Sequence, residues 1–258
     1  METASIKTSH WRGVWIAGVL FLLWWTVCKM GIWSSYLLPS PKRVWNALVG
    51  MAVSGELAEG MLVSISRVAC GFSLAFLAAF ILGVLSGAVP RLAAWLHPVI
   101  DFLRNIPPLS LVPLLILWFG IGEPSKVALI FLAAFFPMFL NIEKGISGCN
   151  RQLLEVGRVF GFSQRQIFLR ILLPGAIPDI LIGMQIGLGY SWRAIVGAEM
   201  IAAASGLGYL ILDAQYLART DKVIAGILVI GATGYLCNLL FLRLNRSWRR
   251  EEGADASD

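Results

Sequence analysis

Residues 155–174 read EVGRVFGFSQRQIFLRILLP and form a polar, cationic segment between two apolar stretches. Gly161 is placed to end one short helix in a left-handed cap, and Ser163 with Gln166 three residues later forms a capping box that starts the next helix. Pro174 is expected to stop this second helix. The segment therefore predicts two short helices joined by a tight turn, with exposed arginines, and we interpret it as a docking element for a soluble partner or for lipid headgroups.

The composition is typical of an integral membrane protein. The chain has 258 residues, of which 58% are hydrophobic and 14% are charged, and its mean hydropathy is +0.76, outside the range of soluble domains. The net charge of +6 could suit nucleic acid, but the basic residues are scattered over loops without a basic aromatic face, so no nucleic-acid partner is expected. The cysteines lack metal-ligand or disulfide spacing, and His97 is isolated, so we predict no metal site and no acid–base site.

Alternating apolar runs and polar turns predict an all-α polytopic protein with about six membrane-spanning helices. The predicted spans are residues 14–33, 61–89, 109–121, 127–142, 179–203 and 223–242. Two further segments, residues 44–49 and 92–103, predict short helices that lie at the membrane interface. The membrane domain thus covers residues 14–246 and contains a coupling loop at 150–178, between a short polar start, 1–13, and an acidic tail, 247–258.

The distribution of basic residues predicts the orientation. If the N-terminus lies inside, 13 of the 21 Lys and Arg residues fall on the inner side, six fall on the outer side and two lie within spans. This bias follows the positive-inside rule. It predicts that both termini and the coupling loop are cytoplasmic, and that the outer side carries Lys29, Lys42, Arg43, Lys126, Arg219 and Lys222.

Three ionisable residues fall within the predicted spans, where an unpaired charge costs about 2.5–3.5 kcal/mol. Arg67 and Glu199 lie at the same depth near the outer face, because their spans run in opposite directions, and they are a candidate ion pair. Arg193 lies nearly two turns deeper. Arg193, and with it Arg67, could line a path for an anion with Glu199 at its outer mouth. Alternatively, the pair locks two helices and Arg193 bonds backbone carbonyls.

Small residues crowd the fifth predicted span. Gly183 and Gly187 form a G-x-x-x-G pair, and further small residues continue the same low-bulk surface. Such a surface lets the backbone of a second helix approach closely. The pair therefore predicts tight packing between this span and a neighbouring helix.

The spacing of the glycine and of the closing leucine-proline pair after Glu155 resembles the EAA loop of ATP-binding-cassette (ABC) importer permeases. Val156 and Gly157 replace the two alanines that follow the glutamate in that loop. In that family the loop seats in a groove of the ATPase subunit. The resemblance implies ATPase-coupling roles for Glu155, Arg158, Gly161, Ser163, Gln166 and Pro174.

Further segments resemble the permeases of the nitrate, sulfonate and taurine class of bacterial importers. In chain order they are LLPSP near Pro39, SISRV at 64–68, NIPPL at 105–109, WFGIGE at 118–123, FFP at 135–137, and GAEM followed by SGLGY within 197–209. This resemblance implies the type I importer fold, a homodimer of permeases in the inner membrane, two cytoplasmic ATPases, and a periplasmic or lipid-tethered substrate-binding protein.

The chain contains no G-x-x-x-x-G-K-[ST] phosphate loop, so we expect it to be non-catalytic, with no cofactor of its own and with ATP and Mg held by the partner ATPases. An ion-driven transporter or a channel is the alternative, and it would need acids along an intramembrane route and an inverted repeat. A membrane-embedded enzyme would need His, Asp or Cys clustered at one depth. The membrane arginines favour a small anion such as a sulfonate, taurine or nitrate, while neutral and cationic solutes remain alternatives.

Overall fold

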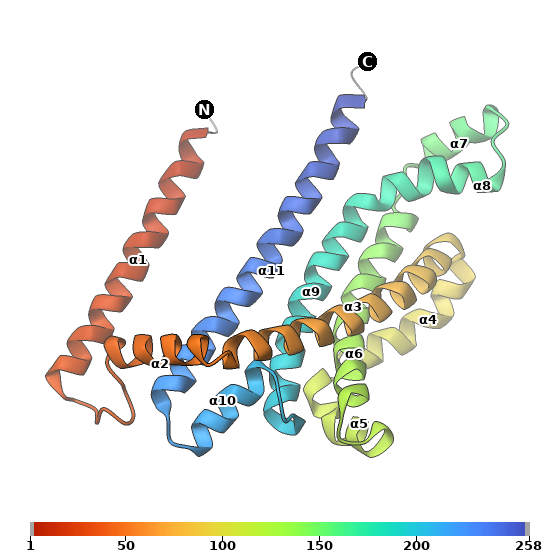
Figure 1. The fold of residues 1–258 in the computed structure, drawn as a ribbon. Coiled ribbons are helices and arrows are strands. Elements are labelled where there is room, and N and C mark those ends of the chain that lie inside the picture. Colours follow the sequence, from red (N-terminus) through yellow and green to blue (C-terminus); the bar gives the residue numbers. More distant parts are fainter. Residues whose placement is uncertain (1–2, 256–258) are drawn as a thin grey trace. The chain divides into compact units, whose positions relative to one another are not determined.

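The computed structural model describes the backbone of residues 3–255 and the side chains of residues 15, 16 and 18–245. Residues 1–2 and 256–258, at the ends of the predicted cytoplasmic segments, lie outside the described residues. The same holds for the side chains that carry part of the predicted inner charge: Lys7, Arg12, Arg246, Arg249 and Arg250. Within the described range every regular element is a helix, which confirms the all-α class (Figure 1).

The helices follow one another with short connections. They are α1 (Thr3–Met30), α2 (Pro41–Val53), α3 (Glu56–Ala88), α4 (Pro90–Leu103), a 3-10 helix (Pro108–Leu111), α5 (Val112–Phe119), α6 (Glu123–Ser147), α7 (Arg151–Val159), α8 (Gln164–Ile167), a π-helix (Phe168–Leu172), α9 (Leu173–Ala202), α10 (Leu207–Tyr216) and α11 (Thr220–Asp255).

Four helices of the described chain are long and apolar enough to cross a membrane: Glu56–Ala88, Glu123–Ser147, Gln164–Ala202 and Thr220–Asn245. A fifth span exists only if α4 and the segment Pro108–Phe119, which are bent by 81° at their junction, are taken together as one broken or re-entrant span.

The described residues thus show four or five of the about six predicted spans. The predicted third span, 109–121, contains a 3-10 turn and the eight-residue helix α5, which is only about 12 Å long and cannot cross a bilayer alone. Consecutive prolines at 107 and 108 break the helix at this point, because proline lacks the N–H that would continue it. The first predicted span, 14–33, falls in α1 (Thr3–Met30), whose described apolar part is Gly18–Met30.

The fifth predicted span begins earlier than expected. We predicted a helix stop at Pro174 and a new span from residue 179, whereas one helix runs from Gln164 to Ala202. The reason is the π-turn Phe168–Leu172, in which the Leu173 N–H donates to the Phe168 carbonyl five residues back. Pro174 then falls in the first turn of α9, where a missing N–H is tolerated. The predicted stop is wrong.

The chain divides into two compact units, described here separately: Met1–Glu59 with Leu210–Ile230, and Gly60–Tyr209 with Gly231–Asp258. In the first unit, α2 and the start of α11 share a small core formed by Val44, Met51, Leu57 and Ala225. Trp24 of α1 packs against this core. Hydrophobic burial of this kind is what holds the short helix α2 in place.

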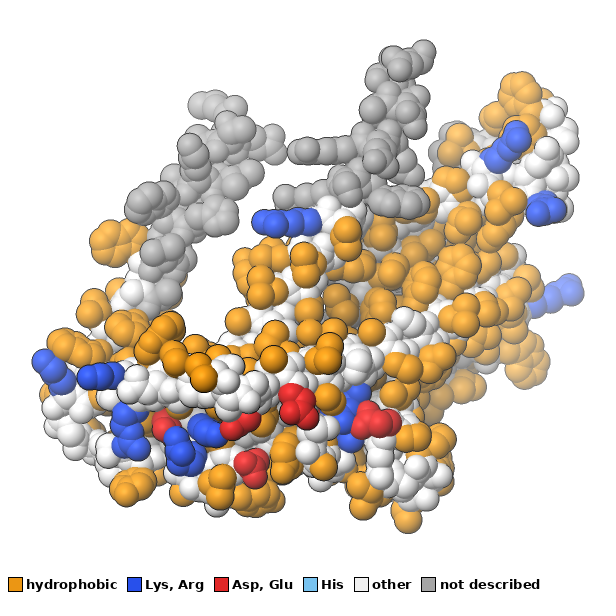
Figure 2. All heavy atoms as spheres, viewed as in Figure 1, with side chains coloured by type: hydrophobic (Ala, Val, Ile, Leu, Met, Phe, Trp, Pro, Cys, Tyr) orange, Lys and Arg blue, Asp and Glu red, His pale blue; other side chains and the backbone are white. Residues whose placement is uncertain are grey.

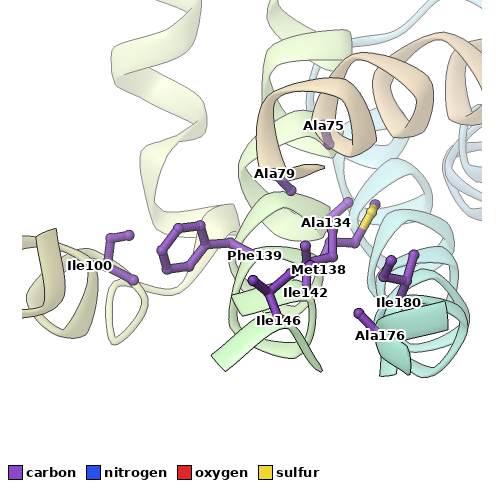
Figure 3. Close-up of a cluster of buried hydrophobic side chains, with 10 residues drawn as sticks. All are labelled: Ala75, Ala79, Ile100, Ala134, Met138, Phe139, Ile142, Ile146, Ala176 and Ile180. Atoms are coloured by element: carbon purple, nitrogen blue, oxygen red, sulfur yellow. The ribbon is translucent and has the colours of Figure 1, made fainter. Parts of the chain in front are cut away.

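The second unit is built around α6. Figure 3 shows Met138, Phe139, Ile142 and Ile146 of α6 between Ile100 on one side and Ala176 and Ile180 of α9 on the other. All of these side chains are buried, and Ala134 of α6 and Ala75 and Ala79 of α3 complete the cluster. Small residues on α3 and α9 let both helices approach α6 closely.

The predicted G-x-x-x-G pair lies at the contact between α6 and α9. A Cβ atom added at Gly183 would lie 2.9 Å from the Asn141 Cβ, and one added at Gly187 would lie 2.7 Å from the Met138 Cε. Gly71, Gly83 and Gly87 of α3 make contacts of the same kind with isoleucines of α6. The prediction of tight helix packing at Gly183 and Gly187 is confirmed.

Candidate functional site

Four polar side chains of the second unit gather at the Arg67 guanidinium, directly or through Glu199, and with Arg67 they form the Arg67 cluster: Ser64, Glu123, Glu199 and Ser205. Arg67 donates to both carboxylate oxygens of Glu123 at 2.6 Å and to Oε1 of Glu199 at 2.8 Å. It also donates to the Ser205 carbonyl at 2.8 Å and to the Ser205 hydroxyl at 3.1 Å. The ion pair that equal depth predicted is thus present.

Glu199 is fully buried and its charge is compensated from several sides. Besides Arg67, its carboxylate accepts from the Ser64 hydroxyl at 2.8 and 2.9 Å and from the Gly208 N–H, in the first turn of α10, at 2.9 Å. The carboxylate therefore also caps a helix N-terminus, where negative charge is favourable. Such a saturated carboxylate is suited to joining α3, α9 and α10 rather than to carrying protons.

Gly206 allows the backbone to pass this close to Glu199. Its φ is 114°, in the region that favours glycine, and an added Cβ would overlap the Glu199 carboxylate. A substitution here would meet both backbone strain and a clash. The glycine that follows Ser205 is thus as much a part of the Arg67 cluster as the charged residues.

Four of the segments that carried the sequence resemblance converge on this cluster: SISRV supplies Ser64 and Arg67, WFGIGE supplies Glu123, GAEM supplies Glu199, and SGLGY supplies Ser205. Sequence reasoning missed Glu123, which it placed in an outer turn together with Lys126. In the structure Glu123 begins α6, and the Lys126 side chain, only 6% exposed, lies 3.2 Å from it. The missed signal was an acid at the start of an apolar helix, at the depth of Arg67.

Arg193 lies apart from this cluster, on the exposed face of α9. Its guanidinium carbon is 5.6 Å from the centre of the Tyr190 ring, a cation–π distance. This ring contact, rather than a backbone carbonyl as the alternative interpretation expected, is the interaction that the structure gives Arg193. Arg67 is 4% exposed. The structure therefore does not bring the two arginines together on one surface.

The docking element has the local geometry that its sequence predicts. The N–H groups of Gly161 and Phe162 donate to the carbonyls of Arg158 and Gly157 at 3.0 and 2.9 Å, with a φ of +75° at Gly161, which is a Schellman cap at the end of α7. Both hydrogen bonds of the Ser163 capping box are present. The Ser163 N–H donates to the Gln166 side-chain oxygen at 2.8 Å, and the Gln166 N–H donates to the Ser163 hydroxyl at 3.3 Å.

One side of this helical hairpin holds it together. Gly157 is buried, and a Cβ there would lie 2.7 Å from the Cδ1 of Ile171 and 3.7 Å from the Cγ1 of Ile167. An alanine at this position would require the end of the Ile171 side chain to shift. The two short helices thus form one packed unit.

The other side of the hairpin is an apolar stripe open to solvent. Leu153, Val156, Val159 and Phe160 are exposed by 53%, 50%, 87% and 75%. Glu155 and Arg158 are exposed on the same helix, α7. An apolar stripe with flanking charges on a short helix is typical of a protein–protein contact.

A second polar cluster ties α3, α4 and α6 together. Oε1 of Glu143, whose side chain is 8% exposed, accepts from the Ser86 hydroxyl and lies 2.9 Å from the Nε2 of His97. In the sequence His97 looks isolated, so the pairing was not predicted. The contact joins residues 46 positions apart, and no local pattern marks it.

A membrane protein with bundled helices, a buried ionic cluster and a capped helical hairpin between two of its spans has the features of an importer permease. Residues 75–250 match the family model described as "Binding-protein-dependent transport system inner membrane component", and the chain belongs to this family. This membership decides against the channel or ion-driven transporter that the sequence left as an alternative. The chain is the membrane permease of an ABC importer, a transport subunit.

Named relatives match most of the chain. It is 37% identical to the putative aliphatic sulfonates transport permease protein of Bacillus subtilis, over 92% of this chain and 87% of the relative. It is 36% identical to the taurine transport system permease protein of Escherichia coli, over 88% of this chain and 85% of the relative. It is 33% identical to the nitrate import permease protein of Synechocystis, over 84% of this chain and 82% of the relative.

Solved structures share the fold. The inward-facing methionine ABC transporter matches with a TM-score of 0.61 at 19% identity, over 74% of this chain and 94% of that chain. An amino acid ABC transporter crystallised with histidines matches with a TM-score of 0.62 at 15% identity, over 79% and 97%. These likenesses establish the type I importer permease fold.

Proposed function

We propose that this permease moves a small anion, of the sulfonate, taurine or nitrate class, across a bacterial inner membrane by alternating access. The names of the relatives from Bacillus subtilis, Escherichia coli and Synechocystis support this class of solute. Separate ATPase chains bind ATP and Mg and drive the cycle, and a substrate-binding protein delivers the solute. The permease holds no cofactor.

The observation that carries the anion proposal is the environment of Arg193. It lies in the candidate span Gln164–Ala202, it is exposed, and its described neighbour is an aromatic ring. An arginine facing lipid in mid-span costs about 2.5–3.5 kcal/mol or more, so this face of α9 borders an aqueous path or a second copy of the chain. A guanidinium there lowers the barrier for an anion and can bind a planar or tetrahedral oxyanion through two N–H groups.

The two faces of α9 support a homodimer around this path. The face with Gly183 and Gly187 is packed against α6. On the other face, Ile186 and Tyr190 are exposed by 40% and 47%, and Arg193 is exposed as well. If two copies of α9 face each other across the path, their arginines line it from both sides. The buried Arg67 and Glu199 then act as a lock or gate in the wall rather than as its lining.

The docking element is the proposed seat of the ATPase. The apolar stripe of α7 enters the ATPase groove, and Glu155 and Arg158 pair with polar groups at its edge. Gly161, Ser163 and Gln166 fix the angle between the two short helices, and Pro174 marks the start of α9. Closure of two ATPases around nucleotide would pull both docking elements together and rock the spans outward, and hydrolysis would reset them.

The proposed topology places both termini and the coupling loop, 150–178, in the cytoplasm. The membrane domain then covers residues 14–246, with residues 1–13 before it and the tail 247–258 after it. The inner-side excess of Lys and Arg supports this orientation. It puts the docking element on the side where ATP is available.

The test measures ATP hydrolysis and uptake by the permease with its ATPases in proteoliposomes, with binding protein loaded with taurine, an alkanesulfonate or nitrate. One loaded ligand should stimulate hydrolysis and appear inside the vesicles. Arg193→Gln should reduce uptake of that anion at least about tenfold, by the loss of roughly 1.4 kcal/mol or more of anion stabilisation, while Arg193→Lys should retain part of it. Normal anion uptake by Arg193→Gln would refute the role of Arg193.

A further inference from the structure

A polar pocket of about 340 Å³ lies in the first compact unit, between α2 and the beginning of α11. Its charged lining consists of Arg43, Glu56, Arg219, Asp221 and Lys222. Figure 2 shows Lys and Arg side chains gathered beneath α2 together with acidic side chains. None of these residues belongs to the Arg67 cluster, the exposed face of α9 or the docking element, so the proposed transport path leaves the pocket without a role.

The charged side chains of the pocket differ in their hydrogen-bond partners. Asp221 accepts two hydrogen bonds from the Arg219 guanidinium, both at 3.1 Å. Glu56 accepts from the Lys222 ammonium at 3.0 Å. Both acids are thus already paired, while the contact that the structure gives Arg43 is with the Ser35 carbonyl at 3.5 Å. Among the described residues of this pocket, Arg43 therefore acts on Asp221 only at longer range, and its N–H groups that face the pocket can donate to an added carboxylate.

The surroundings of the pocket are those of a protein interface. Val53, at the end of α2, is 83% exposed, and Tyr216 and Leu217, just before Arg219, are 78% and 64% exposed. These residues lie outside the helices that are long enough to span a membrane. Exposed apolar and aromatic side chains around a charged pocket match the composition of interface hot spots.

We propose that this pocket receives an acidic side chain of the substrate-binding protein and that Arg43 is its ion-pair partner. The proposal rests on the proposed function, in which the residues of α2 and of the turn before α11 lie on the outer side of the membrane. The paired Arg219 and Lys222 supply a positive surrounding, and the buried Met51 provides an apolar wall. Partial enclosure strengthens the ion pair, since water screens it less.

The experiment titrates loaded binding protein against ATP hydrolysis by the complete transporter in nanodiscs. Arg43→Glu should raise the half-saturating concentration of binding protein at least about tenfold, because the charge pair becomes a repulsion. The basal rate and the rate at saturation should stay unchanged, since the hydrogen bond that the structure gives Arg43 goes to the Ser35 carbonyl and its charge acts on Asp221 only at longer range. Arg43→Gln should give a smaller shift in the same direction.

Lys42→Glu is the matched control. It changes the charge by the same amount on the neighbouring residue of α2, but Lys42 lines a different pocket, with Phe21, Trp25 and Ser40. It should shift the half-saturating concentration by less than about threefold, the size of a screened surface charge effect. In addition, one Asp→Arg or Glu→Arg exchange among the exposed acids of the binding protein should restore tight docking to Arg43→Glu only.

The outcomes separate this proposal from the proposed function. Equal shifts for Arg43→Glu and Lys42→Glu, or no shift for Arg43→Glu, would overturn the pocket as the docking point. A change only in the response to free anion, measured without binding protein, would also overturn it and make the pocket a ligand site. If the unmodified transporter showed no stimulation by any binding protein, the proposed function itself would fail.

Discussion

Two arginines that look alike in the sequence have opposite environments in the fold. Arg67 and Arg193 each interrupt an apolar span, yet Arg67 is buried between two carboxylates whereas Arg193 stacks on an exposed tyrosine. A buried, paired arginine contributes to the fold, because its removal leaves an uncompensated acid behind. An exposed arginine within a span contributes little to the fold and is available for a solute.

Substituting each arginine by methionine tests this contrast. Arg67→Met leaves Glu199 buried without a guanidinium, at a cost of about 3–5 kcal/mol, and should markedly lower the unfolding temperature of the detergent-purified permease. Arg193→Met removes an exposed side chain and should change stability by no more than about 0.5 kcal/mol. Thermal unfolding followed by size-exclusion chromatography measures both.

A second substitution, at Glu199, distinguishes the effect of the unpaired charge from a general loss of folded protein. Adding Glu199→Gln to Arg67→Met removes the unpaired charge and should restore part of the lost unfolding temperature. Equal destabilisation by Arg67→Met and Arg193→Met, with no recovery in the double variant, would contradict the division of roles.

The sequence identified Arg67 and Glu199 as partners because two antiparallel spans bring residues at the same depth together. It did not identify Glu123, because the segment GEPSK has the composition of a turn. What makes Glu123 a partner is the start of α6 at that residue and the packing of α6 beside α3. That relation depends on helix packing and is not encoded in a local pattern.

At the scale of elements, the docking hairpin depends on the cap at Gly161. Its φ is +75° and nothing lies within 4 Å of an added Cβ, so a substitution there is limited by backbone strain alone. Gly161→Val should cost about 1–2 kcal/mol locally and reorient the hairpin, leaving ATP hydrolysis uncoupled from uptake. The ratio of solute moved to ATP hydrolysed in proteoliposomes measures the effect.

Gly161→Asn is the control for this variant, since asparagine tolerates the left-handed conformation better than other non-glycine residues. It should keep most of the coupling. If valine and asparagine had the same effect on the ratio, the backbone conformation at this position would not be what matters.

The packing of α9 on α6 gives a further prediction. At Gly183 an added Cβ would lie 2.9 Å from the Asn141 Cβ and 3.3 Å from the Met138 Cα, so Gly183→Ala must separate the helices and should destabilise the permease by about 1–3 kcal/mol. Gly189→Ala, on the same helix with nothing within 4 Å, should be neutral or stabilising by up to about 1 kcal/mol. Unfolding temperatures that fall equally in both variants would contradict this packing.

Features set by residues close together in the sequence were predicted better than features that depend on the surrounding helix geometry. Both caps of the docking hairpin follow from residues within six positions of each other, and the structure has them. The stop at Pro174 and the separate third span were wrong because each depends on how a proline is accommodated. A π-turn accommodates Pro174, and an 81° bend makes the third predicted span one half of a broken or re-entrant span.

At the scale of the whole molecule, the proposed orientation puts the pocket of α2 and the docking hairpin on opposite sides of the membrane. Single cysteines in a variant lacking Cys28, Cys70, Cys149 and Cys237 test it. A membrane-impermeant maleimide should label Lys42→Cys in intact spheroplasts and Ser163→Cys only after permeabilisation. The reverse pattern would invert the topology, and labelling of both in intact cells would exclude either assignment.

The helix from Gln164 to Ala202 joins α8 and α9 through the π-turn Phe168–Leu172 in one run of 39 residues, with a contour length of about 60 Å. One end carries the hairpin where the ATPase is proposed to push, Arg193 lies along its length, and Glu199 lies near the far end. The π-turn Phe168–Leu172 and Pro178 are the places where this run can bend. From Pro178 to Glu199 the helix continues without a further proline, so a tilt of this part moves Arg193 and the Glu199 lock at the same time.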